Sequence, residues 1–294
     1  MPTLVIGASG LVGYEFYRQN KGKKGWFFTY RSVKVDDFLQ LDASDAGQAE
    51  KLVSELKPDT VILPAAMAWV DKCEREPELA RKNNVELLQN VIDAMKRHGG
   101  RRIVFFSTDY LFDGKGGPYS EDAEPNPLNV YGKIKLECER MLENSGLDYI
   151  ILRTTGIFGW EKQGKNFLYR IFDTLGKGKP IEVPNDQYAT PTYVKDIVGA
   201  AMALLEKGQT GTFNVVGPQY MNRVELSQKF AKGFGFDGGL IVGKPTSEFK
   251  SAAPRPMKAG FRIDKILGLG IRMRTVEEAV EDMKRRKEED DKYE

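Results

Sequence analysis

The sequence has very few of the residues that build metal sites and histidine-based catalytic triads. It contains one histidine and two cysteines in 294 residues, and Cys73 and Cys138 lie far apart without a CxxC partner. Structural zinc sites need about four such ligands, and a serine hydrolase needs a histidine base. We therefore expect no metal, two reduced thiols and no Ser/His/Asp triad. His98 precedes two glycines at a predicted helix end, where the helix dipole favours a cation.

The sequence also lacks a long apolar run and an excess of charge of either sign. Its longest uncharged apolar run, Ile197 to Leu205, covers nine residues, whereas about 20 are needed to cross a bilayer. The net charge is only +2, so no global field attracts nucleic acid or a membrane surface. Because the first predicted strand begins at residue 3, we expect no signal peptide and a cytoplasmic protein.

What the sequence does have is a glycine turn near its start, in TLVIGASGLVG from Thr3 to Gly13. A short apolar run precedes the glycines and a helix-compatible pattern follows them, which predicts a strand, a tight turn and a helix. Gly7 permits the turn, Gly10 lets the backbone approach a pyrophosphate, and Gly13 lets the helix pack on the strand. An ordinary strand-to-helix turn is the alternative, but the flanking elements favour a dinucleotide site.

One basic residue at a strand end suits the adenosine side of such a site. Arg31 follows the aromatic run Trp26 to Tyr30, and an arginine there accommodates a 2′-phosphate, which favours NADP(H) over NAD(H). A solvent-exposed arginine after a strand is the alternative. Asp42 ends a short third strand that precedes a helix from Ala46 to Leu56, capped by Ser44 or Asp45.

The strands and helices alternate four times in roughly 110 residues, which predicts an α/β protein with a doubly wound parallel sheet of the Rossmann type. We predict that residues 1–153 and 188–217 form the NADP-binding domain and that 154–187 and 218–294 form a smaller substrate-binding domain. A helix is expected over Thr190 to Lys207, and a strand over Thr210 to Gly217. After Pro218 we expect helical and irregular segments, ending in a solvated charged tail without a catalytic role.

A candidate proton donor lies on the helix that starts after Asn129. Tyr131 and Lys135 are four residues apart and share a helix face, and a buried strand ending in Thr108 precedes them. Reducing a ketone with hydride needs a proton for the alkoxide, but a phenol has a pKa near 10. Lowering that pKa by two to three units takes roughly 3 to 4 kcal/mol, which a nearby ammonium and an oxidised nicotinamide supply. A tyrosine and a lysine at this spacing are also common on surface helices. The hypothesis of a proton donor therefore depends on the preceding strand that ends in Thr108 and on the glycine turn.

Seven segments, taken together and in order, resemble the dTDP-4-dehydrorhamnose reductase family of extended short-chain dehydrogenases. They are GASGLVG, VDKCEREPELARKNNV, FFSTDYLFDG, PLNVYGKIKLECE, LRTTGIFG, NDQYATPT and PRPMKAGFRIDKI. The related regulatory β subunit of methionine adenosyltransferase shares the pattern, and the resemblance runs from residue 3 to about residue 283. It implies a Rossmann domain, a smaller C-terminal substrate domain, NADPH or NADH, and reduction of the 4-keto group of a nucleotide-linked 6-deoxyhexose, as in dTDP-rhamnose biosynthesis.

The resemblance also implies roles for individual residues. The pyrophosphate turn is lined by Gly10, Leu11 and Val12, and the adenosine and ribose are flanked by Asp42, Ala43, Ala65, Ala66 and Met67. Catalysis falls to Thr108, Tyr131 as the acid and Lys135 as the cofactor anchor. The nucleotide sugar is contacted by Thr108 and Asp109 and faced by Asn166, Asp186, Gln187 and Arg255. Arg255 is the expected diphosphate ligand, because a guanidinium binds phosphate oxygens bidentately; a surface arginine is the alternative.

The sequence departs from the family pattern at two positions. Bacterial reductases often have a tryptophan after RTS, over the sugar, where this chain has Gly156, and Trp160 lies four residues later. Ala259 stands where reductases usually have serine, which favours a non-catalytic NADP-binding regulatory subunit or an altered substrate. A nucleotide-sugar epimerase also stays open, whereas a 4,6-dehydratase is disfavoured because Tyr110, not glutamate, follows Asp109. Some members of the family form homodimers, so a homodimer stays open too.

Overall fold

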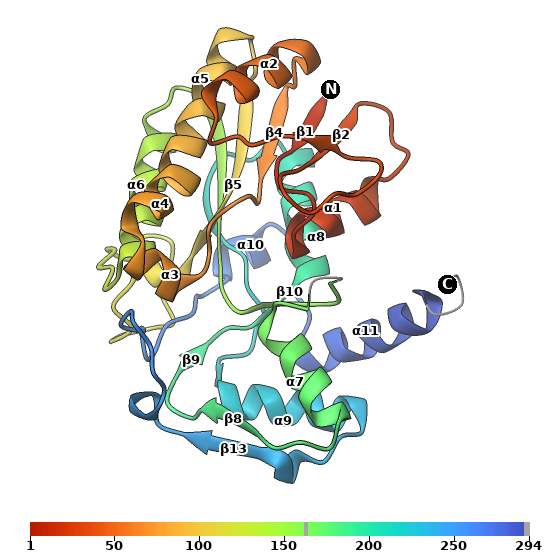
Figure 1. Ribbon diagram of the computed structural model, residues 1–294, viewed down its shortest axis with the longest axis vertical. Coiled ribbons are helices and arrows are strands. Elements are labelled where there is room, and N and C mark those ends of the chain that lie inside the picture. Colours follow the sequence, from red (N-terminus) through yellow and green to blue (C-terminus); the bar gives the residue numbers. More distant parts are fainter. Residues whose placement is uncertain (162–163, 291–294) are drawn as a thin grey trace.

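The computed structural model describes residues 1–161 and 164–290, and its centre is a sheet of seven parallel strands (Figure 1). In spatial order the strands are β11 (Gly211–Asn214), β6 (Asp148–Thr154), β5 (Arg102–Thr108), β4 (Thr60–Leu63), β1 (Thr3–Val5), β2 (Trp26–Tyr30) and β3 (Leu39–Gln40). From β1 the chain adds β2 and β3 on one side and then crosses to β4 on the other. The strand order therefore reverses beside β1, and ligands of doubly wound sheets bind at the carboxyl ends of strands at such a point.

Helices cover both faces of this sheet, in three layers (Figure 1). One face carries α2 (Ala46–Leu56), α5 (Leu87–Arg97) and α6 (Val130–Glu143), and the other carries α1 (Leu11–Asn20), α8 (Val194–Glu206) and α10 (Asp264–Gly268). Each face has its own buried apolar cluster. Within β5, Val104 belongs to one cluster and Ile103 to the other, because successive side chains of a strand point to opposite faces. The predicted doubly wound α/β class is confirmed.

A third apolar cluster holds together a smaller group of elements at the carboxyl end of the sheet (Figure 1). They are α7 (Phe167–Gly176), β8 (Ile181–Pro184), α9 (Arg223–Phe234), β13 (Ile241–Lys244) and α11 (Val276–Asp290). Strands β8 and β13 pair in parallel, and β9 (Tyr188–Ala189) pairs with β12 (Met221–Asn222) in antiparallel fashion. We keep the division into two domains as a proposal, since Phe261 and Met273 pack in the core of the large sheet.

Two segments of the C-terminal half differ from their predicted structure. The helix expected from Thr190 begins only at Val194, because the residues before it are extended and β10 (Thr192–Tyr193) pairs with β7 (Ile157–Phe158). Pro191 accounts for the extended backbone at Thr190, since proline disfavours helical backbone at the residue before it, and the pairing of β10 accounts for Thr192 and Tyr193. The region after Pro218 also contains the strands β12 and β13, which were not expected.

The helical stretch between β4 and β5 is broken at Pro77, as predicted, and again five residues later. Helix α3 (Val70–Arg75) ends before Pro77, α4 (Pro77–Arg81) follows, and a π-helical turn spans Lys82–Glu86. In this turn Asn84 donates from its amide to the Ala80 carbonyl at 2.8 Å and accepts from the backbone N–H of Met67 at 3.1 Å. Such π turns are frequent at functional sites, and this one fixes the loop that leaves β4.

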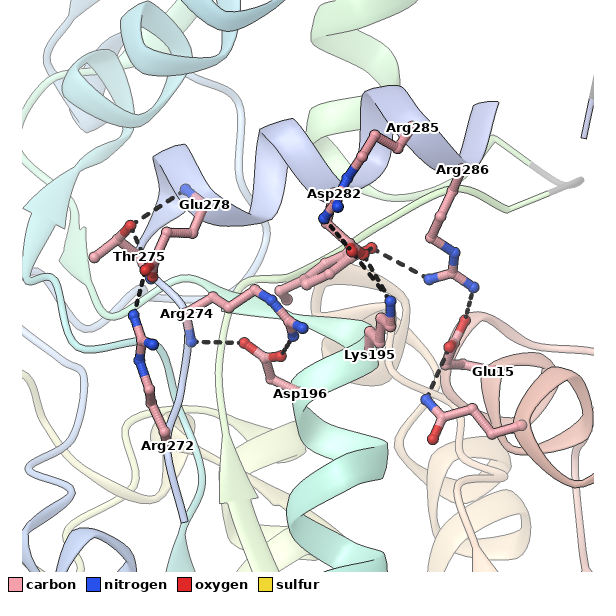
Figure 2. Close-up of polar contacts among 12 residues, drawn as sticks. Glu15, Lys195, Asp196, Arg272, Arg274, Thr275, Glu278, Asp282, Arg285 and Arg286 are labelled. Carbon is pink, nitrogen blue, oxygen red and sulfur yellow. Dashed lines mark hydrogen bonds and ion pairs between the residues drawn. The ribbon is translucent and has the colours of Figure 1, made fainter. Parts of the chain in front are cut away.

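The charged tail is tied to the first helix, which corrects the expectation of a purely solvated segment (Figure 2). Arg286 of α11 donates to the Glu15 carboxylate at 2.7 Å; the Glu15 side chain is buried and the Arg286 side chain is 13% exposed. Arg286 also donates to the Tyr193 hydroxyl at 3.2 Å, and that hydroxyl donates to Asp282 at 2.8 Å. A buried charge needs such partners to offset its desolvation. The last four residues of the tail lie outside the described residues.

Four further observations bear on the composition. Cys73 and Cys138 are free and buried, and His98 ends α5 with its Nε2 2.5 Å from Glu50 Oε1. In residues 1–161 and 164–290, no three histidine, cysteine or acidic side chains gather closely enough to hold a metal ion. No helix within those ranges has both the length and the apolar character that a membrane span requires.

Candidate functional site

The three glycines of the turn after β1 are constrained by different neighbours. Gly7 has φ of +90°, and a Cβ there would lie 2.7 Å from the Ala65 side chain. A Cβ on Gly13 would lie 2.5 Å from the Gly7 carbonyl oxygen. The nearest atom to a Cβ on Gly10 would be 3.6 Å away, which is an ordinary contact. The fold therefore requires Gly7 and Gly13 to be glycine, whereas packing within the chain leaves Gly10 free to carry a side chain.

Gly10 is the N-cap of α1, and it offers no side chain to the first N–H groups of the helix. The first turn contains no acidic residue either, so an anion is the natural partner of these N–H groups and of the positive end of the helix dipole. A cavity of about 240 Å³ opens here. It is lined by Gly7, Gly10, Arg31, Ala43, Ala65, Ala66, Met67, Asn83 and Lys165, among others. An uncapped helix end, a bare Gly10 and this cavity together fit the pyrophosphate of a dinucleotide.

Two further residues of the predicted cofactor site lie beside this cavity. Leu11 lines an adjoining cavity together with Gly10 and Tyr14. The side chain of Val12 packs against the apolar clusters, so only its backbone N–H is left for a ligand at the helix start. The residues predicted to bind the cofactor thus lie together at one edge of the sheet. Val12 and Gly13 lie behind the cavity that the others line.

On the adenosine side, Arg31 has its side chain 52% exposed and reaches two partners. Its guanidinium donates to Asn83 Oδ1 and lies 3.9 Å from Asp42 Oδ1. The Asp42 carboxylate accepts from the backbone N–H and the hydroxyl of Ser44, at 3.0 and 2.7 Å. Asp42 therefore stabilises the turn from Asp42 to Ser44 with its own side chain. The N-cap of α2 is Asp45, one of the two predicted caps.

The carboxyl end of β5 brings Thr108 close enough to Tyr131 for its hydroxyl to lower the pKa of the phenol. Both are buried, as is Lys135 one turn further along α6. The Lys135 ammonium lies 3.9 Å from the centre of the Phe105 ring, and burial lowers the pKa of Lys135 to about 8. Asn129 caps α6 by accepting from Gly132 N–H at 2.9 Å, which confirms the predicted start.

The pKa of Tyr131 is raised in the chain without a cofactor. Burial raises it above its ordinary value and Cys73 adds to the rise, while the neighbouring Thr108 hydroxyl opposes them. Desolvation is the largest cause, because it disfavours the charged phenolate. The lowering expected from Lys135 and an oxidised nicotinamide acting together stays a prediction. A lowered pKa would have to come from the positive nicotinamide of a bound cofactor.

On the substrate side, a small cavity of about 50 Å³ lies between the end of β5 and the smaller lobe. Its lining includes Asp109, Tyr110, Gly156, Gln187, Arg223 and Ala259. Burial raises the pKa of Asp109 to about 6, opposed first by a hydrogen bond from Thr155. Arg223 was not predicted from the sequence. Its one signal is a basic residue directly after Asn222, the N-cap of α9.

The other predicted substrate residues are engaged within the chain. Asn166 caps α7 and donates from its amide to the Gly159 carbonyl at 2.9 Å. Asp186 accepts from the backbone N–H of Thr246 at 3.0 Å. Arg255 donates to the Asp71 carboxylate at 2.7 Å, and its guanidinium carbon lies 6.0 Å from the Tyr110 ring centre. Arg255 therefore borders the site with its charge already paired.

Trp160 does not take the place of the tryptophan that Gly156 replaces. Its indole N–H donates to the Met283 carbonyl at 2.8 Å, and its ring packs edge-on against Phe172. It is thus part of the smaller lobe's aromatic core. Gly156 has φ of +54° and lines the small cavity, so that cavity has no aromatic platform from this position.

A larger cavity, of about 1190 Å³, lies elsewhere, between α9 and α11. Its walls are charged side chains such as Lys229, Arg272, Glu277 and Glu281, most of them joined in ion pairs across the surface. It contains none of the residues at the carboxyl ends of the strands. We therefore place the candidate site at the glycine turn and the end of β5, where the chemistry-bearing groups gather.

The strand order, the glycine turn and the Tyr/Lys helix define the chain as a Rossmann-fold protein of the extended short-chain dehydrogenase type. It belongs to the RmlD substrate binding domain family, whose model matches residues 1–288.

Known proteins similar to the chain include a subunit of methionine adenosyltransferase and dTDP-4-dehydrorhamnose reductases. It is 31% identical over 284 residues to methionine adenosyltransferase 2 subunit beta of Xenopus tropicalis, covering 92% of this chain and 83% of that protein. A dTDP-4-dehydrorhamnose reductase structure from Clostridium acetobutylicum is 31% identical with a TM-score of 0.86, over 96% of this chain and 98% of the other. The Bacillus anthracis reductase, in complex with NADP, is 27% identical with a TM-score of 0.86, over 96% and 99%.

Proposed function

We propose that the protein is a nicotinamide-dependent reductase of the 4-keto group of a nucleotide-linked 6-deoxyhexose, with NADP(H) as its cofactor. The observation that carries the proposal is the buried group Thr108, Tyr131 and Lys135 at the end of β5, beside the cleft at Gly10. The similarity to dTDP-4-dehydrorhamnose reductases over nearly the whole chain supports this substrate class.

In this proposal the cofactor lies across the switch point of the sheet. The N–H groups of Leu11 and Val12 would hold its pyrophosphate, and Arg31 would hold a 2′-phosphate, which a carboxylate in its place would repel. Ala65, Ala66 and Met67 leave room for a flat nucleotide. When bound, the reduced nicotinamide supplies the hydride.

The chain's own residues handle the proton. Tyr131 donates its hydroxyl proton to the oxygen that becomes an alkoxide, and the Thr108 hydroxyl holds that oxygen in place. Lys135 holds the nicotinamide ribose, so the hydride donor is oriented relative to the carbonyl. The closed, apolar surroundings of Tyr131 exclude water from this step. NAD(H) would bind to the same glycine turn and small residues, but it has no 2′-phosphate for Arg31 to contact.

The test is a reduction assay with purified protein, NADPH and dTDP-4-keto-6-deoxyhexose, following nicotinamide absorbance. We expect substrate-dependent oxidation of NADPH, with a weaker rate for NADH. If absorbance stays constant although calorimetry detects NADPH binding, the reductase assignment is wrong.

A regulatory subunit is the second candidate, favoured by the similarity to methionine adenosyltransferase 2 subunit beta. Mixing the protein with a methionine adenosyltransferase and measuring complex formation and synthetase kinetics tests this candidate. An epimerase would instead interconvert two sugars without net NADPH consumption, which product analysis separates from reduction.

A further inference from the structure

The substrate side of the cleft contains a guanidinium whose charge is not paired. Arg223 lines the small cavity together with Asp109, Tyr110 and Gln187. Its Nε–H donates to Gln187 Oε1 at 3.0 Å, and its guanidinium carbon lies 4.9 Å from the centre of the Phe167 ring. Within the described part of the chain this guanidinium forms no ion pair and no other hydrogen bond.

Positive side chains lie near Arg223 in addition to the acidic groups of its cavity. Arg170, which is exposed, lies against the same Phe167 ring, at 5.9 Å from its centre, and it has no ion-pair partner among residues 1–161 and 164–290. Desolvation lowers the pKa of Arg223, Tyr110 and Asp109 oppose this, and the charges of Arg255 and Arg170 lower it further. A desolvated guanidinium with like charges nearby costs free energy, and an anionic ligand offsets that cost.

A chain of hydrogen bonds fixes the orientation of Arg223. Gln187 accepts from Arg223 with its carbonyl oxygen and donates from Nε2 to Thr246 Oγ1 at 3.0 Å. The Thr246 hydroxyl donates in turn to Asp186 Oδ1 at 2.5 Å. Asp186 and Gln187, which the sequence suggested as direct sugar contacts, therefore position the arginine. The Nε edge is engaged with Gln187, while the two terminal nitrogens keep their donors for a ligand.

We propose that Arg223, supported by Arg170, binds an anionic group of the substrate, either the diphosphate of a nucleotide sugar or a carboxylate on the sugar. This inference rests on the proposed function and deepens it, since Arg255, the expected diphosphate ligand, is paired with Asp71. A guanidinium with free terminal nitrogens binds either group through two parallel hydrogen bonds. Gln187 is a positioning residue in this arrangement.

The first experiment measures binding of inorganic pyrophosphate by calorimetry in the presence of saturating NADP⁺, which occupies the glycine turn. We expect Arg223→Met to weaken pyrophosphate binding at least about 10-fold. Arg223→Lys should weaken it less, because a lysine keeps the positive charge but cannot form the two parallel hydrogen bonds of a guanidinium. Gln187→Leu should also weaken binding. The control is Arg262→Met, which removes an exposed arginine paired with Asp264.

The affinity for NADP⁺ reports whether each variant is folded and should stay unchanged. If the wild-type protein does not bind pyrophosphate, or if Arg223→Met binds it as tightly as the wild type does, the inference is overturned. Because no turnover is measured, this outcome is separate from failure of the reductase assay: the anion site can exist in a protein that reduces nothing.

A second titration separates the two sources of the anion. We compare UDP, UDP-glucose and UDP-glucuronate on the wild type and on Arg223→Met. An equal loss of affinity for all three assigns Arg223 to the diphosphate. If the variant loses only the advantage in affinity that UDP-glucuronate has over UDP-glucose, Arg223 is assigned to a sugar carboxylate. Unchanged affinity for all three contradicts both assignments.

Discussion

The two sides of the cleft are built in different ways. The cofactor side consists mainly of backbone: the glycine turn, the uncapped start of α1 and the small residues after β4. The substrate side consists of side chains from segments far apart in sequence, including Asp109, Gln187 and Arg223. A backbone cradle follows from strand order and glycine spacing, so local sequence specifies it. A side-chain cluster depends on how several loops pack, so one substitution can change what it recognises.

The largest expected effect lies where the two sides meet, at Tyr131. Replacing Tyr131 with phenylalanine removes the proton donor and leaves the ring's packing in place, so turnover should fall about 1000-fold. The affinity for NADPH should stay within a factor of two or so, because the cradle is elsewhere. Reduction kinetics and calorimetry check this, with Tyr149→Phe at the partly exposed start of β6 as the control. Unchanged turnover would contradict the catalytic role of Tyr131.

The next effect concerns the link between the cofactor helix and the smaller lobe (Figure 2). Arg286→Met leaves Glu15 buried without its cation and should lower the free energy of unfolding by about 3 kcal/mol. Arg285→Met removes the neighbouring arginine, whose side chain is 72% exposed, and should cost about 0 to 1 kcal/mol. Denaturant titration measures both. If the two variants lose the same free energy of unfolding, burial of the ion pair between Arg286 and Glu15 contributes no stability.

A pair of glycine variants separates what the ligand requires from what the fold requires. Gly10→Val should fold with an unchanged melting temperature but bind NADP⁺ about 100-fold more weakly, because the side chain occupies the place of the pyrophosphate. Gly13→Val should lose both stability and binding, since its Cβ would meet the Gly7 carbonyl. Thermal melts and calorimetry distinguish the two results. Loss of stability in both variants would mean that Gly10 is also a packing requirement.

On the substrate side, Asp109 should make stability depend on pH. Its pKa in the folded protein is about 6, above its ordinary value of 3.8, so the folded state holds the proton more tightly. As pH rises from 3.8 to about 6, the stability that the protonated group contributes is therefore lost. Asp109→Asn should gain stability relative to the wild type over this interval, by about 3 kcal/mol, and level off above it. If denaturant titrations show the same pH dependence of the free energy of unfolding for the wild type and for Asp109→Asn, the raised pKa of Asp109 is refuted.

The smallest expected effect is at the adenosine end. Arg31→Ser should lower the preference for NADPH over NADH about 10-fold by weakening only NADPH binding, because the guanidinium pairs with the 2′-phosphate. Arg18→Ser, a change on α1 away from the turn, serves as the control. Calorimetric titration with each cofactor gives the ratio. If the preference does not change, Arg31 acts only through Asn83 and Asp42.

Much of the architecture follows from local patterns in the sequence. The alternation of apolar strands with capped helices predicted the doubly wound sheet, and Asn129 and Pro77 predicted element ends that the structure contains. The late start of α8 and the strands β12 and β13 were missed, because they depend on pairing with distant segments.

The candidate site shows the same division. The glycine turn and the Tyr131/Lys135 spacing could be recognised because each lies within one turn of one element. The pairing of Arg255 with Asp71 spans 184 positions in the chain, and the direction of the Tyr131 pKa depends on burial, which spacing does not report. Arg223 was missed for the same reason: its function arises from Gln187 and Phe167, which other loops bring to it.

The contact between Glu15 and Arg286 also has a consequence for synthesis of the chain. Glu15 belongs to the first helix, but its cation comes 271 positions later. During translation, the nascent sheet can form its early strands while this carboxylate still lacks a counter-ion. The final helix therefore closes the molecule: α1 reaches its full stability only after α11 has left the ribosome and docked.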